Sequence, residues 1–257
     1  MITYKTEEEI GLIRESAEIL AKAHAEVARR IKPGVKTIDL DKVAFEYIKD
    51  QGGHPSFKGF NGFPFSLCIS VNENVVHGFP GAYELKEGDI VSVDCGVYYK
   101  GCHSDCAYTY PVGDISDDIR KLLEVTKKSL YVGIEQVAKG KRIGDIGFSI
   151  QSFVENHGYT IIRELVGHGV GKELHESPEV PNYGKRGKGI KLKKGMVLAI
   201  EPMVNMGKRN VVQENDGWTI RTKDRLPSAH FEHTVTVTDN GAEIITSHQY
   251  LEEFIKV

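Results

Sequence analysis

The chain opens with two stretches, residues 6–31 and 37–51, in which apolar residues recur at alternating spacings of four and three. This is the spacing of a helix with one buried face. A capping box at Thr6–Glu9 begins the first stretch, and glycines follow both. The same pattern returns at residues 119–139 and 146–157. The chain is therefore predicted to contain two pairs of amphipathic helices.

A pair of strands is predicted after each pair of helices. In the first half, apolar runs at residues 90–99 and 102–110 flank a turn that we place at residues 98–101. In the second half, the corresponding runs cover residues 196–203 and 231–238. Each half is thus expected to end in a hairpin-like pair of strands.

The two helix-and-strand sets match position by position, for example Gly34 with Gly140 and Asp39 with Asp145. The offset between the two matching sets is much longer than the 20–50 residues or so after which solenoid proteins repeat. We therefore expect a single α+β domain covering residues 1–257. Its two homologous halves, about 1–112 and about 113–257, would be related by a pseudo-twofold axis.

Acidic residues recur at equivalent places in the two halves. With the turn placed as above, Asp94 falls opposite Asp105 on one sheet face, and Glu201 and Glu232 occupy the matching positions. Alone, the first pair could be two solvated acids. Four carboxylates brought together would repel one another, and two divalent cations would balance their charge. His168, which lies between glycines, is our candidate for an additional imidazole ligand.

The period of two in a strand also sorts the neighbouring residues. Cys95, Cys102 and Cys106 are predicted to point away from the acidic face, so we do not assign them as ligands. His103 and His230 fall on the acidic side, where roles in packing or in supporting the ligands are favoured over ligation.

Composition and charge narrow the class of protein. The 33 basic and 36 acidic side chains give a net charge of −3, which provides no global attraction for nucleic acid or acidic membranes. The beginning of the chain lacks the pattern of a signal peptide, and no apolar run approaches the ~18 residues of a membrane span. A cytoplasmic protein is expected.

Four motifs together resemble the five-ligand signature of type I methionine aminopeptidases: Asp94-x10-Asp105, Gly167-His-Gly-Val-Gly171, Ala199-Ile-Glu-Pro202 and Phe231-Glu-His233. Stretches 70–80, 175–178 and 216–225 resemble the same family. The likeness covers nearly the whole chain and is closest to the bacterial or organellar form. It implies the pita-bread fold, in which two α/β halves enclose a central metal cleft.

The resemblance also implies roles for the ligands. Asp94 would chelate a first metal ion, Asp105 and Glu232 would bridge both ions, and His168 with Glu201 would complete the second site. The ions would be Fe, Mn, Co or Zn, and the ligands alone do not choose among them. Two such cations allow hydroxide to form near pH 7, and Glu201 would move the proton.

By the same resemblance, His77 would contact the substrate amide nitrogen and His175 the scissile carbonyl region. Sequence alone would give both histidines packing or surface roles. The implied pocket for the methionine side chain is lined by Phe57, Phe60, Phe63, Cys68, Leu174 and Trp218. Phe60 and Phe63 stand where bacterial relatives often have tyrosine, and Leu174 stands where phenylalanine is frequent.

The resemblance thus implies a metallo-aminopeptidase that hydrolyses N-terminal methionine from nascent or short peptides. Its partners would be peptide N-termini, with transient ribosome contact, and it would be a monomer without nucleic-acid or membrane sites. One alternative is a proline-specific aminopeptidase, although Asp94 comes too early for the large domain that usually precedes the metal-binding half. Another is a metal-free pita-bread module that binds peptides. Type II enzymes carry a helical insertion between the positions matching His168 and Glu201, where this chain is short.

Overall fold

The computed structural model describes residues 1–252 and residue 254. Its helical elements are α1 (Glu7–Ala28), α2 (Thr37–Asp50), the 3-10 turn η1 (Phe60–Gly62), α3 (Asp117–Ile134), α4 (Ile143–Asn156) and α5 (Gln249–Glu252). The four long helices confirm the two predicted pairs. The capping box is present, because the Thr6 side chain accepts the Glu9 N–H and the Glu9 carboxylate accepts the Thr6 N–H. Helix α1 ends before the predicted residue 31, since helical torsions are disfavoured just ahead of Pro33.

Fifteen strands are described: β1 (His54–Pro55), β2 (Leu67–Val71), β3 (Asn74–Val76), β4 (Ile90–Tyr99), β5 (Cys102–Pro111), β6 (Thr160–Ile161), β7 (Gly167–Gly169), β8 (Glu176–Val180), β9 (Val197–Ile200), β10 (Met203–Asn205), β11 (Val211–Gln213), β12 (Ile220–Thr222), β13 (Ser228–His230), β14 (His233–Thr238) and β15 (Gly241–Ile244). In the first half, β4 pairs with β5 on one side and with β1 and β2 on the other. The second half has a five-stranded sheet in the order β15-β14-β9-β7-β8. Smaller sheets, β13-β10-β6 and β11-β12-β3, complete the fold.

The β4–β5 hairpin corrects the predicted register. Asp94 pairs with Ala107, and Asp105 pairs with Gly96, so the prediction that the two aspartates are directly opposed is wrong by two residues. The turn consists of Lys100-Gly101 alone, with φ angles of 49° and 86°, and such two-residue turns match the twist of a hairpin. Because the shift is even, both aspartates keep the predicted face and lie diagonally across the ladder.

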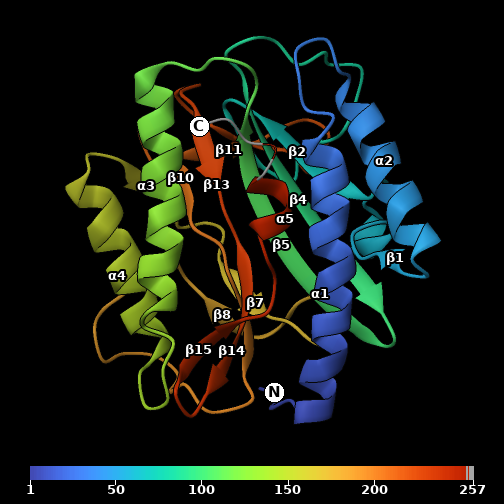
Figure 1. Cartoon of the computed structure of the whole chain (residues 1–257). Helices are drawn as coiled ribbons and strands as arrows, with labels where there is room; N and C mark the ends of the chain where they lie inside the picture. Colours follow the sequence, from blue (N-terminus) through green and yellow to red (C-terminus); the bar gives the residue numbers. More distant parts are fainter. Residues whose placement is uncertain (253, 255–257) are drawn as a thin grey trace.

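The two halves meet where β5 runs beside β13 and β14 (Figure 1). The Thr234 hydroxyl accepts the Asp105 N–H at 3.1 Å and donates to the Asp105 carbonyl at 2.7 Å. In the same way, the Thr109 hydroxyl accepts the His230 N–H at 2.9 Å and donates to the His230 carbonyl at 2.7 Å. Threonine side chains from each half therefore complete backbone hydrogen bonds of the other and bring the acidic segments side by side.

The helices lie on one side of the sheets. In Figure 1, α1 and α3 lie in front of the strands, whereas α2 and α4 lie at the two outer edges of the molecule. The main apolar core joins both halves and includes Leu20, Val93, Leu130, Ile150 and Val235, all buried. Within the described residues, no helix is long and apolar enough to cross a membrane. Because the helices cover one face of the sheets, the opposite face is free to form a cavity.

Candidate active site

The five predicted ligands converge from both halves. Asp94 lies in β4, Asp105 in β5 and His168 in β7, whereas Glu201 follows β9 and Glu232 lies between β13 and β14. Ligand atoms of Asp94, Asp105 and Glu232 lie within 4.8 Å of one another, and so do those of His168, Glu201 and Glu232. Glu232 belongs to both groups. The structure therefore brings together two adjoining ligand sets that share a carboxylate.

The chemistry of these acids fits divalent cations. Three oxygens, Asp94 Oδ1, Asp105 Oδ1 and Glu232 Oε1, are buried without a hydrogen-bond partner among the described residues. Burial raises the pKa of Asp94 to about 7. Burial and the charges of neighbouring acids raise the pKa values of Asp105, Glu201 and Glu232 well above their ordinary range. Unpartnered buried carboxylate oxygens are costly unless a cation compensates them, and oxygen ligands with an imidazole suit such an ion.

The surroundings of His168 favour a neutral imidazole. Its Nδ1–H faces the Gly169 carbonyl oxygen at 2.9 Å, which can only accept, so Nε2 carries the lone pair. Nε2 lies 3.8 Å from Asp105 Oδ2 and 3.6 Å from Glu201 Oε1. Burial and then the neighbouring His175 lower the pKa of His168 to about 3. The imidazole is therefore uncharged near neutral pH and aims its lone pair at the acids.

The glycines around His168 permit close backbone packing, as expected from the sequence. A Cβ at Gly167 would lie 2.3 Å from the Ala199 carbonyl oxygen, and one at Gly169 would lie 2.7 Å from the Ser177 carbonyl oxygen. No side chain fits at those distances. β7 can thus lie close against its neighbouring strands and place His168 beside the acids.

His77 and His175 line the same cavity as the acids. His77 follows β3 with φ at 57°, a left-handed conformation that is uncommon for non-glycine residues. The His175 ring centroid is 4.1 Å from that of His168 and 5.1 Å from that of Phe60. Both histidines therefore border the space in front of the ligands.

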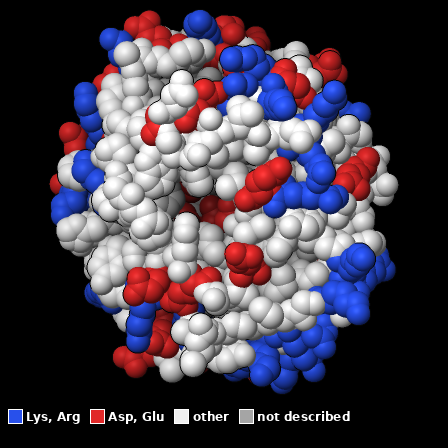
Figure 2. Space-filling view, turned by 180° about the vertical axis from the view of Figure 1, so that it is seen from behind, with Lys and Arg blue, Asp and Glu red and all other residues white. Residues whose placement is uncertain are grey.

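The cavity has a volume of about 370 Å³ and is lined by every predicted site residue. Its apolar end is formed by a buried cluster of Phe57, Phe63, Cys68 and Leu174, with Phe60 and Trp218 packed against it. The Phe63 and Trp218 rings meet edge to face at 5.1 Å. Figure 2 shows a hollow on the face away from the helices, with acidic atoms in its depth. An apolar pocket and an acidic centre thus share one opening.

Several lining residues were not predicted from the sequence: Asn61, Val76, Glu164, Leu165, Val166 and Met203. Asn61, Val76, Val166 and Met203 lie within two residues of predicted site residues, which could have indicated them. Glu164 and Leu165 lie in the loop before β7, where no periodic pattern marks them. Asn182 was not predicted either. Its side-chain amide donates a hydrogen bond to the Glu201 backbone carbonyl at 2.9 Å.

The neighbours that the sequence excluded as ligands lie near the site in other roles. His103 is hydrogen-bonded to the Ser56 hydroxyl at 2.8 Å. His230 Nε2 lies 3.8 Å from Glu201 Oε2. Cys95 and Cys106 face the apolar core, as their strand positions predicted. Cys106 Sγ lies 3.3 Å from His248 Nε2, on the core side of β5.

Known proteins resemble the chain over almost its full length. Residues 11–239 match the family model of metallopeptidase family M24. The chain is 53% identical over 246 residues to methionine aminopeptidase 1 of Bacillus subtilis, covering 96% of this chain and 99% of that protein. It is 42% identical over 247 residues to the methionine aminopeptidase of Escherichia coli, covering 95% and 94%.

Solved structures give the same result. The methionine aminopeptidase of Thermotoga maritima has a TM-score of 0.95 at 46% identity, covering 96% of this chain and 100% of that one. A prolidase from Pyrococcus furiosus has a TM-score of 0.79 at 25% identity, and the chain covers 65% of its length. The chain therefore belongs to metallopeptidase family M24, has its pita-bread fold, and falls among the methionine aminopeptidases of the bacterial type.

Proposed function

We propose that this chain is a metal-dependent aminopeptidase that releases methionine from the N-termini of nascent or short peptides. The main support is one cavity that combines two ligand sets sharing Glu232 with an aromatic pocket. The names of the relatives support the same reaction and substrate.

The acids and His168 would hold two divalent ions. Asp94 would belong to the first site and His168 with Glu201 to the second, while Asp105 and Glu232 would serve both. The ligand atoms of these residues lie in overlapping groups, which supports this assignment. When bound, such ions neutralise the carboxylates, lower the pKa of water and polarise the scissile carbonyl. The unpartnered oxygens of three of these acids support this assignment. Fe, Mn, Co and Zn all suit this mixture of oxygen and nitrogen ligands.

Glu201 is the residue we assign to proton transfer. Its backbone carbonyl is fixed by Asn182, and its carboxylate lies between His168 and His230, at the cavity wall. Burial, followed by the charges of Asp94 and Asp105, raises its pKa. A carboxyl group with a raised pKa accepts and returns a proton more readily near neutral pH.

His77 and His175 are assigned to substrate orientation. Burial, and then His175, lowers the pKa of His77 to about 4, so its ring is neutral and offers one N–H donor and one acceptor. With His77 placed at the substrate amide nitrogen and His175 at the carbonyl region, the scissile bond would lie in front of the acids. Such fixed orientation of the reacting groups lowers the barrier without extra chemistry.

The aromatic pocket is assigned to the methionine side chain. Phenylalanine rings, Cys68 and Trp218 give it soft apolar walls, and a flexible thioether packs well against aromatic rings. Leu174 is smaller than the phenylalanine that frequently stands at this position in relatives. This difference affects the fit of the pocket but leaves the acids unchanged.

The same proposal covers the location, oligomeric state and ribosome contact of the protein. Nascent chains present methionine as they leave the ribosome, so a cytoplasmic monomer making brief ribosome contacts suits this substrate. Basic side chains gather along one edge of the face that carries the hollow, a surface that favours such contacts (Figure 2). We also propose that residues 1–257 form one domain of two halves, about 1–112 and 113–257, because the cavity takes walls from both.

The decisive experiment measures peptide cleavage and bound metal on the same preparation. Methionine release from Met-Gly-initiated peptides after addition of Mn²⁺, Fe²⁺ or Co²⁺ is the expected result. Met-Lys-initiated peptides test tolerance for the following residue, and Xaa-Pro-initiated peptides test the proline-specific alternative. Cleavage confined to Xaa-Pro would select that alternative. A preparation without metal that gains no activity from any ion would instead favour a peptide-binding module.

A further inference from the structure

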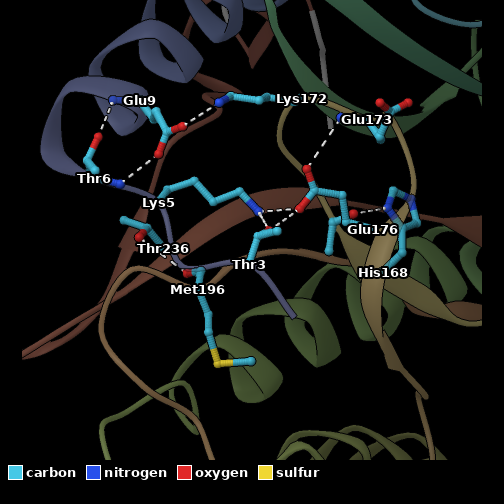
Figure 3. Close-up of polar contacts among 11 residues, drawn as sticks. Thr3, Lys5, Thr6, Glu9, His168, Lys172, Glu173, Glu176, Met196 and Thr236 are labelled. Atoms are coloured by element: carbon cyan, nitrogen blue, oxygen red, sulfur yellow. Dashed lines mark hydrogen bonds and ion pairs between the residues drawn. The ribbon is translucent and has the colours of Figure 1, made fainter. Parts of the chain in front are cut away.

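The N-terminal segment lies against the loop that joins β7 to β8, and two of its side chains converge on Glu176 (Figure 3). Lys5 Nζ lies 2.5 Å from Glu176 Oε2, and the Thr3 hydroxyl donates to the same oxygen. The side chains of Lys5 and Glu176 are only 6% and 9% exposed. Segments far apart in the sequence are thus joined by a buried ion pair.

This ion pair packs directly on the loop. A Cβ at Gly171 would lie 2.4 Å from both Lys5 Cε and Glu176 Oε1, so glycine leaves the space that the pair occupies. Glu176 Oε1 also faces the Glu173 N–H, with a donor–acceptor distance of 3.3 Å. The Lys5 N–H donates to the Gly195 carbonyl at 2.7 Å, which anchors the N-terminal segment itself. The loop is therefore fixed to a segment that is tied down elsewhere.

A second ion pair joins the same two segments but lies at the surface. Lys172 Nζ lies 3.0 Å from Glu9 Oε1, and the Lys172 side chain is 71% exposed. Glu9 is already held by the capping box with Thr6. Exposed ion pairs of this kind contribute little to stability. Lys172 therefore provides a matched control for Lys5.

The loop carries His175 immediately before Glu176. Glu176 turns toward Lys5, whereas His175 lines the cavity with its ring 4.1 Å from that of His168. We infer that the Lys5–Glu176 pair is a brace that sets the position of His175 in the active site. Lys5 is then a positioning residue, an inference that rests on the proposed role of His175.

The electrostatics of Glu176 agree with this role. Burial by itself raises the pKa of Glu176, but the hydrogen bonds from Lys5 and Thr3 outweigh burial and lower it. Removing the Lys5 ammonium would leave a buried carboxylate without its cation. Because an unpaired buried charge is strongly unfavourable, the carboxylate would move toward water or take up a proton. Either response disturbs the loop next to His175.

The test places Lys5→Met in the full-length wild type and in a His175→Ala background. Turnover of a Met-Gly-initiated peptide with Mn²⁺ and the thermal midpoint are measured for each. We expect Lys5→Met to lower kcat about tenfold or more, since small displacements of an orienting group have large effects. KM should change by less than about twofold, and kcat should fall no further in the His175→Ala background, since both changes act through one group. Lys172→Met should behave like the wild type.

Two further measurements separate positioning from general destabilisation. The double variant Lys5→Met/Glu176→Gln has no unpaired buried charge but also lacks the ion pair, so it should regain thermal stability while kcat stays low. Recovery of wild-type kcat in this variant would overturn the brace. The imidazole NMR signals of His175 should shift in Lys5→Met but not in Lys172→Met, whether or not the protein turns over substrate.

An equal fall in kcat in both backgrounds, or no fall in the wild type, would overturn the brace. Unshifted His175 signals in Lys5→Met would do the same. Wild-type turnover by His175→Ala would overturn the role of His175 together with the brace. A wild type that releases no methionine, while the His175 signals shift as expected, would count against the proposed function alone.

Discussion

The two halves place acids at equivalent points of the fold but in different local structures. Asp94 and Asp105 lie inside the continuous strands of the β4–β5 hairpin, where the ladder fixes their direction. Glu201 and Glu232 lie at breaks between strands, and Pro202 follows the first of them. Their side chains are one methylene longer than aspartate. A regular ladder can thus position short acids, whereas an interrupted strand needs longer side chains to reach the same centre.

The halves also differ in what they add around the acids. The first half joins its strands by the two-residue turn Lys100-Gly101. The second half inserts residues 201–232 between β9 and β14, including the loop that carries Trp218 to the cavity. Asp216 holds this loop by accepting the Trp218 N–H at 2.8 Å. The first half contributes Asp94, Asp105 and four of the six predicted pocket residues, whereas the second adds Trp218 and our candidate for proton transfer.

The largest effect is expected from Glu201→Gln, which tests whether the second half carries the reactive group. The amide keeps the shape of the side chain but cannot accept a proton, so kcat should fall by about 10²–10⁴-fold. Circular dichroism and the thermal midpoint should show an intact fold. Glu179→Gln, at an exposed position in β8, is the matched control and should retain activity. Wild-type turnover by Glu201→Gln would remove the proposed proton-transfer role.

Removing the metal ions should make the stability of the protein depend on the protonation of the acids that both halves contribute. Burial raises the pKa of Asp94 from an ordinary value of 3.8 to about 7, so the folded protein binds a proton that the unfolded chain releases. This stabilisation is present at low pH and is lost as pH rises through about 7. The raised pKa values of Asp105, Glu201 and Glu232 make the stability fall with rising pH in the same way. Above pH 6.5 the metal-free protein should therefore become less stable as pH rises.

The pH range of this measurement is set by the histidines. His77 and His168, whose pKa values are lowered to about 4 and about 3, make the folded state more stable as pH rises toward their ordinary value of 6.5. Thermal midpoints should therefore be recorded between about pH 6.5 and 8, in chelator and in Mn²⁺. Bound metal should raise the midpoint and abolish the downward slope. The same slope with and without metal would contradict the proposed ligand set.

A smaller effect is expected from Trp218→Leu, which tests the pocket wall of the second half. Loss of the indole removes an aromatic wall against which the methionine thioether would pack. Sulfur–aromatic contacts of this kind contribute about 0.3–1.5 kcal/mol, so KM for a Met-Gly peptide should rise about 3- to 10-fold. The value of kcat should change less, because the acids are untouched. Leu226→Ala is a control in the same inserted segment, where the side chain is 43% exposed. An unchanged KM would place methionine elsewhere.

Sequence patterns predicted the regular elements better than their register. An apolar run predicted β4 with the correct bounds, because most of this strand is buried. The register was wrong because it depends on the turn, and a positive φ at Lys100 is unusual for a non-glycine residue. The acidic face survived this error, since a shift of two residues preserves side-chain direction.

The site was predictable where motifs mark it and unpredictable where only tertiary contacts do. His168 was identified because the flanking glycines signal close backbone packing. Asn182 carries no comparable mark, since its hydrogen bond to the Glu201 carbonyl depends on how distant segments meet. The Lys5–Glu176 pair is also invisible in the sequence, where a lysine near the beginning of the chain is ordinarily an exposed residue.

The smallest effect concerns the tight turn that distinguishes the first half. Gly101 has a φ of 86° and no atom within 4 Å of a built Cβ, so Gly101→Ala introduces backbone strain without a clash. It should lower the free energy of unfolding by about 1 kcal/mol in urea titrations. Gly11→Ala in α1, also without a clash, should instead raise it by about 0.5–1 kcal/mol because alanine favours the helix.

Activity measurements on the same variants show what holds the aspartates in register. If Gly101→Ala is less stable but turns over normally, the β4–β5 ladder fixes Asp94 and Asp105 and the turn only closes it. If turnover falls in parallel with stability, the turn itself determines how the first half presents its acids. We expect the first outcome, because ten residue pairs along the ladder oppose any slip that a strained turn would cause.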